Sequence, residues 1–598
     1  MIVQMKKLLL AARSTEREQV LEILRQAAVV HVAPAEPEQV KVPGSLGEAI
    51  DACGRALNIL AQIEVAGGTD QLASPGTPTR LVEETLSHNH EVSLCKDQFL
   101  MLNRQLEEIR PWGNLGLEDL AWLKAEGLHI SFMKGPSKAE FSIDADAVLW
   151  VYSVDSEAVF LAVSRQAIPL PEGFVEMTPP AHESSEILEE IQNCQQKLHD
   201  HQQALQSLAM RREDLEKHLT KLLNRKRYAE VESGVHNAEE IFVLAGWCPE
   251  DKQTSLHKAF EEAEISVGID FSTPADDEIP PTMLANQPWA ESIQPMYDFM
   301  GMTPSYNEPD VSAIFLLTLT VFASFLVADA GYGLMVLLPL LIGYKTLVAR
   351  GVDGKLLRLG MFLYGGATIY GVLTNTWFGH TFRLVEAYQF NPESPEGSFI
   401  LQGLCLFIGI IHLTVGHLMK IARRKIDLTL LSEIGWVMFL WGMYGLICQM
   451  LLGKSFVMPA SWSIPLFKVS TVLIFAFTAP SFNIFKSIMA GFTSMLMNAS
   501  AAFSDILSYI RLWAVGLAGG KLAAAFNNIS AMLPAVNLFG LALPLLQIPL
   551  LIVGHLGNMI LGIIGILAHG VRLNLLEFSN HLELDWAGHK YEPFKEIK

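Results

Sequence analysis

The sequence predicts a multi-domain protein: N-terminal α+β lobes joined by a long coiled-coil hairpin arm, then an all-α membrane domain with eight transmembrane helices. Half of the 598 residues are hydrophobic and only 18% are charged, and most charges precede residue 305. One segment of the first part repeats apolar residues at heptad spacing. The second part holds apolar stretches long enough to cross a bilayer, which takes about 20 residues. We therefore divide the chain into 1–305 and 306–598.

The first part alternates short strand-like and helix-like segments. "VQMKKLLLAA", "TEREQVLEILRQA" and "VVHVAP" predict strand, helix and strand, and residues 140–170 alternate as a β-strand does. "IFVLAGWCPEDKQTSLHKAFEEAEISVGIDF" predicts another strand, helix and strand. The apolar run at the N-terminus has about six residues, shorter than the core of a signal peptide. We expect this part to stay in the cytoplasm.

Between these lobes, residues 184–230 carry a heptad pattern. Its a and d positions hold Ile187, Ile191, Cys194, Leu198, Leu205, Leu208, Leu215, Leu219 and Leu222. Such a seam predicts one long helix packed on a partner helix. The expected partner is the helix at about 80–110, through Leu86, Phe99, Leu102, Leu106 and Ile109.

The apolar half contains eight predicted spans, and the last two are unusually long. The spans are 311–328, 331–347, 358–379, 399–419, 430–452, 465–485, 488–530 and 541–583. A helix of about 40 residues is about 60 Å long at 1.5 Å per residue, twice the hydrocarbon thickness. We therefore expect the last two helices to be tilted or kinked.

Basic loops indicate the orientation. One loop follows the second span and another follows the fourth, and together they contain Lys345, Arg350, Lys355, Arg358, Lys420, Arg423, Arg424 and Lys425. Positive loops lie on the cytoplasmic side. With eight spans, both termini are then cytoplasmic.

Composition excludes several classes of function. A net charge of −20 argues against nucleic-acid binding, which needs a basic surface. The six cysteines form no CxxC pair, and no ligand set predicts a metal or cofactor. "GLAGGKLA" lacks phosphate-loop spacing, so we expect no nucleotide site and no enzyme activity of the chain by itself.

Two arginines are predicted near mid-membrane depth, Arg511 in the seventh span and Arg572 in the eighth. A charge there costs several kcal/mol and normally faces the protein interior or a water path. Snorkelling and a structural ion pair within the bundle are the alternatives.

Polar and small residues accompany both arginines. Residues at helical spacing form one stripe on the eighth span: His555, Asn558, Gly562, Gly565, His569 and Arg572, with Glu577 beyond. Around Arg511 the matching face holds Ser504, Ser508, Ala514, Ala518 and Gly519, with Asp505 close by. Small residues let another helix approach closely. A helix packed statically in its own bundle would show the same seam.

Several segments resemble the membrane stator subunit of V/A-type rotary ATPases, called subunit I or subunit a. The similar segments are "SYIRLWAVGLA", "LAHGVRLNLLEF", "VADAGYGL", "VLAGWCP", "PPTMLANQPW" and "MYDFMGMTPSYNEPD". They run in order from about Phe242 to the C-terminus. Many relatives carry a carboxylate where Gly562 stands, and some carry histidine where Gly519 stands.

The resemblance implies a mechanism and a set of partners. A rotating ring of small hairpin membrane subunits, each with one carboxylate, would pass Arg511 and Arg572. Two half-channels would deliver H⁺ or Na⁺ and take it away, with His569, Glu577, Asp505, Ser508, His555 and Asn558 as candidate lining residues. The arm would be held by peripheral stalk subunits of a complex that includes catalytic V1 or A1 subunits. The chain's length favours a bacterial or archaeal type in the plasma membrane.

Two other classes of function are alternatives. A secondary transporter with a cytoplasmic regulatory domain would need repeated halves, and the sequence has no repeat relating spans 1–4 to spans 5–8. A membrane-anchored coiled-coil scaffold would not need arginines at membrane depth.

Overall fold

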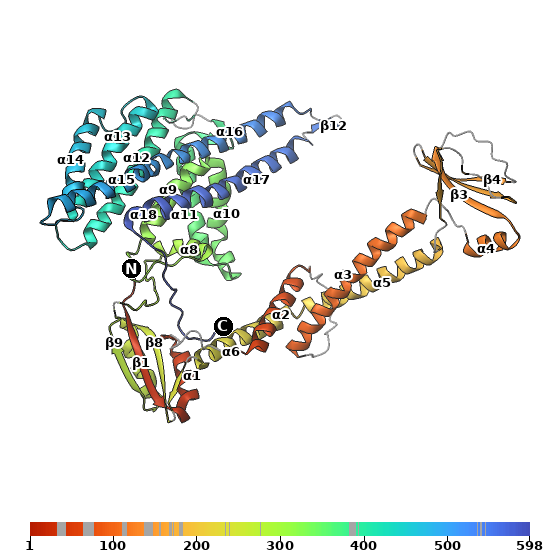
Figure 1. Cartoon of the computed structure of the whole chain (residues 1–598), viewed down its shortest axis with the longest axis horizontal. Coiled ribbons are helices and arrows are strands. Elements are labelled where there is room, and N and C mark those ends of the chain that lie inside the picture. Colours follow the sequence, from red (N-terminus) through yellow and green to blue (C-terminus); the bar gives the residue numbers. More distant parts are fainter. Residues whose placement is uncertain are drawn as a thin grey trace.

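A computed structural model of the chain comprises an arm and a helical membrane domain joined through a small lobe (Figure 1). The structure describes all residues except 33–42, 64–76, 110–115, 137–146, 155–156, 167–169, 171–172, 179–182, 234, 239, 276, 382–389, 391, 393, 535, 539–540, 544–545 and 598.

The lobe next to the membrane domain is an antiparallel sheet with helices packed on it. Its strands run in the order β2-β8-β1-β9, with β7 paired to β8. Their bounds are Met5–Arg13 (β1), His31–Val32 (β2), His236–Ala238 (β7), Ile241–Pro249 (β8) and Gly268–Ser272 (β9). Helices α1 (Arg17–Ala27) and α7 (Gln253–Glu262) bury their apolar faces against it. Both predicted groups of strand, helix and strand thus meet in one sheet, because β1 pairs with β8 across the whole arm.

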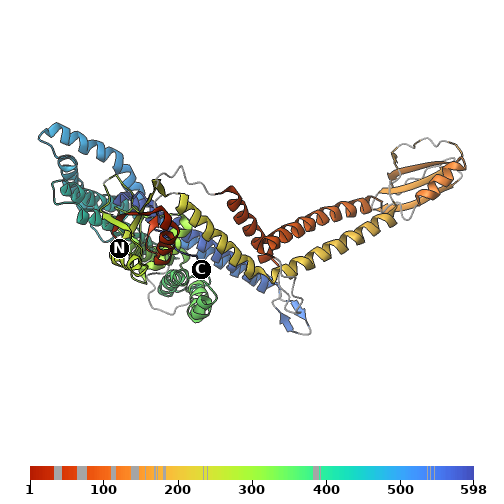
Figure 2. The same ribbon diagram turned by 90° about the horizontal axis from the view of Figure 1, so that it is seen from below.

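The arm is built from four helices in two packed pairs. They are α2 (Gly44–Ala61), α3 (Pro78–Ile109), α5 (Ser184–Ala209) and α6 (Arg212–Ser233). α3 lies along α5 in both views (Figures 1 and 2), and α2 packs on α6. The prediction of one continuous helix over 184–230 is wrong. The chain turns at Met210–Arg211, where Arg211 bonds the nearby Asp214 side chain, and the second half exchanges α3 for α2 as its partner.

A second lobe lies at the far end of the arm (Figure 1). Its sheet runs β4-β5-β3-β6, beside helix α4 (Leu117–Ala125). The strands are β3 (His129–Pro136), β4 (Ala147–Val154), β5 (Glu157–Ser164) and β6 (Val175–Met177). Sequence reasoning found the alternating segment of β4 and β5 but not β3, which pairs with β5 along its whole length.

The membrane domain has seven apolar helical segments long enough to span a bilayer in the described part of the chain, and an eighth, α9, is shorter. The segments contain α9 (Ser312–Val327), α10 (Ala330–Ala349), α11 (Gly354–Leu373), α12 (Pro395–Arg423), α13 (Leu430–Leu452), α14 (Ser463–Phe477), α15 (Ile484–Ser508), α16 (Ile510–Met532), α17 (Gln547–Gly565) and α18 (Ser579–Leu582). α9 lies in the centre and contributes buried phenylalanines and leucines to the core. α16 and α17 run obliquely to α10 and α11 and end beyond them at the hairpin of β12 (Val536–Leu538) and β13 (Leu541–Leu543) (Figure 1).

The C-terminal tail after α18 leaves the membrane domain and joins the first lobe. The Phe594 backbone N–H donates to the Val30 carbonyl at 2.7 Å, and the Phe594 ring is buried in the core of the lobe. Asn224 of α6 exchanges two hydrogen bonds with the Ile597 backbone. The two ends of the membrane domain's chain, at Val311 and Leu582, thus both lead to the same lobe.

Candidate functional site: the two arginines and their cavities

Arg511 stands at a break between two helices. α15 ends at Ser508 and α16 begins at Ile510, with Tyr509 between them. The Tyr509 side chain is fully buried, and its hydroxyl lies 2.8 Å from His412 Nδ1. This anchored tyrosine fixes where α16 starts, and so fixes the partly exposed Arg511 two residues later.

Arg572 lies in a stretch where the last helix widens. π-helical segments at Ile566–Gly570 and Leu573–Phe578 flank it. Hydrogen bonds in a π-helix join residues five apart, and such segments occur often at functional sites. This geometry places Glu577, five residues later, with Oε1 at 3.8 Å from Arg572 Nε. The Arg572 side chain is 51% exposed and that of Glu577 only 4%, so the pair reaches from the interior to an open face.

The centre of the site contains buried polar atoms that the described residues do not satisfy. These atoms are Arg511 Nη1, His569 Nδ1 and Glu577 Oε2. The charges of both arginines act on His569 and on Glu577, so the four side chains form one electrostatic group. A buried polar group without a partner costs about 1–3 kcal/mol, which makes such atoms rare. Neither arginine is sealed inside the bundle.

A cavity of about 300 Å³ opens on one side of the arginines, between α16, α17 and α10. Asn558 lines it and donates from Nδ2 to the Tyr332 hydroxyl at 3.1 Å and to the Gly519 carbonyl at 3.0 Å. The Tyr332 hydroxyl also lies 2.6 Å from His555 Nδ1. Tyr332 and His569 line the same cavity, and His555 contacts it through its hydrogen bond to Tyr332.

A larger cavity, about 430 Å³, lies on the other side, near α18. Asp505 lines it and accepts a hydrogen bond from His581, with Oδ2 and Nε2 3.1 Å apart. The charge of Asp505 also acts on Glu577. α18 lies on the side of the membrane domain that faces the first lobe, whereas the β12–β13 hairpin is at the opposite end (Figure 1).

Ser508 is not brought into this arrangement. Its hydroxyl donates to the Ser504 carbonyl one turn earlier, and it is absent from the described lining of both cavities. The residues of the stripe predicted on the eighth span do not all share one environment. Asn558 and Gly565 are buried against neighbouring helices, while Arg572 is exposed.

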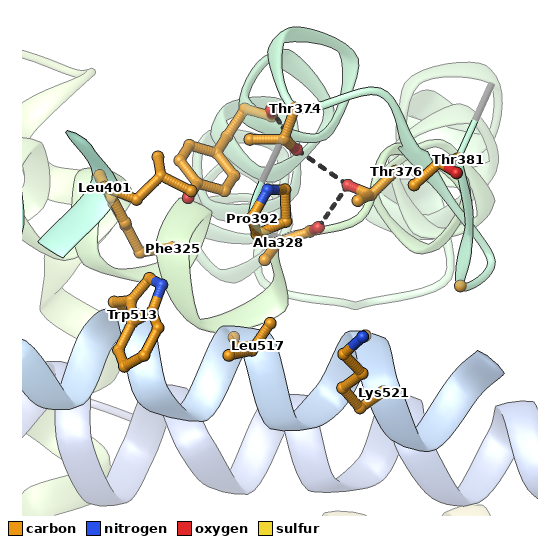
Figure 3. A pocket seen from close by; sticks show the side chains of 14 residues that line it. Phe325, Ala328, Thr374, Thr376, Thr381, Pro392, Leu401, Trp513, Leu517 and Lys521 are labelled. Atoms are coloured by element: carbon orange, nitrogen blue, oxygen red, sulfur yellow. Dashed lines mark hydrogen bonds between the residues drawn. The ribbon is translucent and has the colours of Figure 1, made fainter. Parts of the chain in front are cut away.

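A third, smaller pocket of about 40 Å³ lies beside α16 (Figure 3). Thr376 Oγ1 donates to the Ala328 carbonyl at 2.7 Å and lies 2.9 Å from Thr374 Oγ1, facing Trp513 and Lys521. None of the predicted site residues is among the described residues that line it. The described residues also contain no cluster of three metal-ligating side chains.

Sequence reasoning missed three contributors to the cavities. Tyr332 belongs to the segment "VADAGYGL", whose position between two spans was the available signal. His581 falls just before the end of the last span, and Glu433 just after the start of the fifth. Neither forms a recognisable pattern with its own neighbours, because their partners come from other helices.

Comparison with known proteins finds relatives that align with the whole chain. No protein-family model matches it. V-type ATP synthase subunit I of Borreliella burgdorferi is 28% identical, with 100% of both chains aligned, and V-type ATP synthase subunit I 1 of Treponema pallidum gives the same values. Over its whole length the chain is similar to V-type ATP synthase subunit I.

More distant relatives of this family agree over less of the chain. A-type ATP synthase subunit I of Methanocaldococcus jannaschii is 23% identical over 60% of this chain and 55% of its own. A crystal structure of the cytoplasmic N-terminal domain of a V-ATPase subunit I, the homolog of subunit a, covers 45% of the chain at 15% identity with a TM-score of 0.21, too low to support an argument. This similarity over the full length identifies the chain as a non-catalytic membrane subunit of an ATP synthase complex.

Proposed function

We propose that this stator subunit carries ions past a rotating partner and so couples H⁺ or Na⁺ translocation to ATP synthesis or hydrolysis. The observation that carries the proposal is the open face with Arg511 and Arg572, whose neighbouring buried polar atoms lack partners among the described residues. Since unsatisfied buried groups cost free energy, a second chain that supplies partners is the economical explanation. A ring of small hairpin subunits, each with one membrane carboxylate, has the required chemistry.

The arginines act as a fixed positive barrier. A guanidinium stays protonated at any relevant pH, so it favours an ionised carboxylate beside it. A ring carboxylate that reaches Arg511 or Arg572 therefore gives up its ion and cannot pass as a neutral group. Direct leakage between the two sides is blocked by the same charge.

The two cavities supply the half-channels. The cavity with Asn558 and His569 lies along α16 and α17, which extend to the β12–β13 hairpin, and the cavity with Asp505 lies near α18, on the side of the first lobe. The charges of Asp505, Arg572 and Arg511 all act on Glu577, and we assign this carboxylate the connection between the second cavity and the ring. We keep Ser508 as a candidate only for contact with the ring.

Both termini lie on one side of the membrane in this proposal, and that side is the cytoplasm. The tail and the N-terminal lobe pack together, so the chain between them crosses the bilayer an even number of times. Seven long apolar segments in the described residues need α9 as the eighth. The basic loops meet this side, since Lys355 pairs with Glu291 at 3.3 Å and Arg423 donates to the Asn307 carbonyl.

The cytoplasmic part, residues 1–305, acts as the stator arm, and residues 306–598 form the membrane domain, with the tail returning to the arm. An arm held by peripheral stalk subunits lets torque turn the ring and not this chain. We place the complex in the plasma membrane.

Replacement of Arg511 by alanine in the assembled complex tests the proposal. We expect ATP-driven ion pumping to be lost while the complex still assembles, and the Arg511→Lys variant to stay impaired because lysine is a point charge that can deprotonate when buried. Lys521→Ala, ten residues further along α16, is the control and should pump. Pumping at the wild-type rate by Arg511→Ala would refute the proposed role.

A further inference from the structure

A continuous chain of hydrogen bonds crosses the cavity that contains Asp505. Asp505 Oδ2 lies 3.1 Å from His581 Nε2, and His581 Nδ1 lies 3.0 Å from His417 Nε2. His417 Nδ1 lies 3.0 Å from Glu433 Oε2. Both nitrogens of both imidazoles are thus engaged, and α12, α13, α15 and α18 each contribute one member.

The number of protons in this chain of hydrogen bonds follows from its geometry. Each of its three hydrogen bonds needs one proton, and with both carboxylates ionised all three must sit on the two histidines. Two neutral imidazoles carry only two protons, since each has one N–H donor. The complete chain therefore contains one neutral histidine and one imidazolium. When the proton between His417 and His581 crosses, the positive charge moves from one ring to the other.

Glu433, at the outer end of the hydrogen-bond chain, is bound by two cations and lies next to the cavity. Lys420 Nζ and Arg424 Nη1 lie 2.8 Å and 3.2 Å from Glu433 Oε1, so this carboxylate stays ionised and fixed. Both cations also reach Glu583, whose side chain is 64% exposed. All these side chains line the 430 Å³ cavity, so solvent reaches the histidines from this end.

The inner end points toward the arginine site. Asp505 is partly buried, with 19% of its side chain exposed, and its charge acts on Glu577. Glu577 in turn keeps one buried oxygen without a partner among the described residues. A proton delivered to Asp505 therefore has an acceptor region beside Arg572.

We propose that His417 and His581 relay protons between the cytoplasmic cavity and Asp505, and that the ion carried is therefore H⁺. The inference rests on the proposed function, since Asp505 belongs to its second half-channel. In one step His581 gives its Nε2 proton to Asp505 and takes a proton at Nδ1 from His417 Nε2, which leaves both rings neutral. The His581 ring then turns over, which brings its remaining N–H to Asp505 and frees the facing nitrogen of His417, where cavity water supplies the next proton. One proton enters and one leaves, and the original set of hydrogen bonds is restored.

The same contacts do not suit a sodium ion. The two imidazoles are in direct hydrogen-bond contact at 3.0 Å, which leaves no room for an ion between them. Hard cations take oxygen ligands, and the middle of this chain offers only nitrogens. A buried pair of histidines is, by contrast, an ordinary proton shuttle.

The test uses the intact complex in sealed vesicles, with ATP-driven acidification measured in sodium-free buffer. We expect His581→Ala and His417→Ala to assemble normally and to pump about 100-fold more slowly, within the range that positioned proton-transfer groups contribute. Added imidazole should restore the rate of His581→Ala, because the freed space opens on the cavity. Ser432→Ala is the matched control: Ser432 lines the same cavity and bonds Thr478, outside the chain.

The outcomes separate the relay from the proposed function. Normal pumping by both alanine variants, with pumping lost in Arg511→Ala, would overturn the relay and leave the proposed function intact. Normal pumping by Arg511→Ala would overturn both. Uptake of ²²Na⁺ without acidification by the unmodified complex would overturn the assignment of the ion. If His581→Ala does not assemble, His581→Gln decides, since an amide keeps the hydrogen bonds but cannot relay a proton.

Discussion

Two buried glutamates in the membrane domain, Glu433 and Glu577, have opposite surroundings. Glu433 is 5% exposed and Glu577 is 3% exposed. Three side-chain nitrogens lie 2.8–3.2 Å from the oxygens of Glu433, those of Lys420, His417 and Arg424. The nitrogen paired with Glu577, Arg572 Nε, is 3.8 Å away, and the other oxygen of Glu577 finds no donor among the described residues.

The difference distinguishes a structural charge from one that awaits a partner. A buried carboxylate that only holds helices together is stable when the chain itself supplies its donors. A carboxylate that must exchange with a moving subunit cannot be saturated in that way. Glu433 fits the first description, and under the proposed function Glu577 fits the second, although the two side chains are similarly buried.

The largest effect is expected from Glu433→Ala. Removing one partner of a buried ion pair leaves the others uncompensated and costs about 3–5 kcal/mol. Here His417 would lose its carboxylate partner, and Lys420 would keep only the exposed Glu583. We expect the membrane domain to unfold at lower denaturant concentration, measured on the purified chain in detergent.

The exposed Glu583 provides the matched control. It pairs with the same Lys420 and Arg424 but is 64% exposed, so Glu583→Ala should cost about 0–1 kcal/mol. Equal losses in the two variants would show that burial of Glu433 is not what matters.

Glu577→Gln should affect function and leave stability unchanged. The amide has the same shape, and the lost charge has no close partner, so the free energy of unfolding should change by no more than about 0.5 kcal/mol. ATP-driven pumping by the assembled complex should fall about 100-fold, because a proton-transfer group is lost. A variant that pumps normally would place Glu577 with the structural charges.

Asn558→Ala should have an intermediate effect on stability. It removes the donor to Gly519 O and one partner of Tyr332, and a buried group left unsatisfied costs about 1–3 kcal/mol. If water in the 300 Å³ cavity replaces the amide, the cost will be at the low end. Thermal unfolding in detergent measures it, with Asn527→Ala, which removes the partner of His555 Nε2, for comparison.

The sequence predicted the residues of the arginine site better than their surroundings. Arg511, Arg572, His569 and Glu577 were recognisable because charged and polar residues stand out in apolar helices. The break at Tyr509 and the π-helical turns around Arg572 were not, because both depend on how neighbouring helices pack.

Contacts between residues on different helices were the main feature that the sequence did not predict. Nothing in the local pattern connects Asp505 with His581, or His417 with Glu433, since each pair joins different helices. For the same reason the heptad pattern predicted a continuous helix through Arg211, although its second half packs on α2. Periodicity gives the buried face of a helix but not the identity of the neighbour.

The smallest expected effect concerns the contact between the C-terminal tail and the first lobe, which lies outside the membrane. His31 Nδ1 accepts the Glu592 backbone N–H at 3.1 Å, and burial lowers the pKa of His31 below its usual 6.5. The unfolded segment therefore binds a proton that the folded one does not as the pH falls below about 6.5. Stability of the junction should be constant above that pH and should decrease below it, until the lowered pKa is passed.

Hydrogen exchange at the Glu592 amide measures this junction in the intact chain. We expect faster exchange at pH 5.5 than at pH 7.5, after correction for intrinsic rates, and no such change in His31→Gln, which cannot titrate. The Asn224–Ile597 contact contains no titratable side chain and serves as the internal reference. If both contacts loosened together in His31→Gln as well, the pH dependence would belong to the surrounding ion pairs, such as Arg25–Glu596, and not to the histidine.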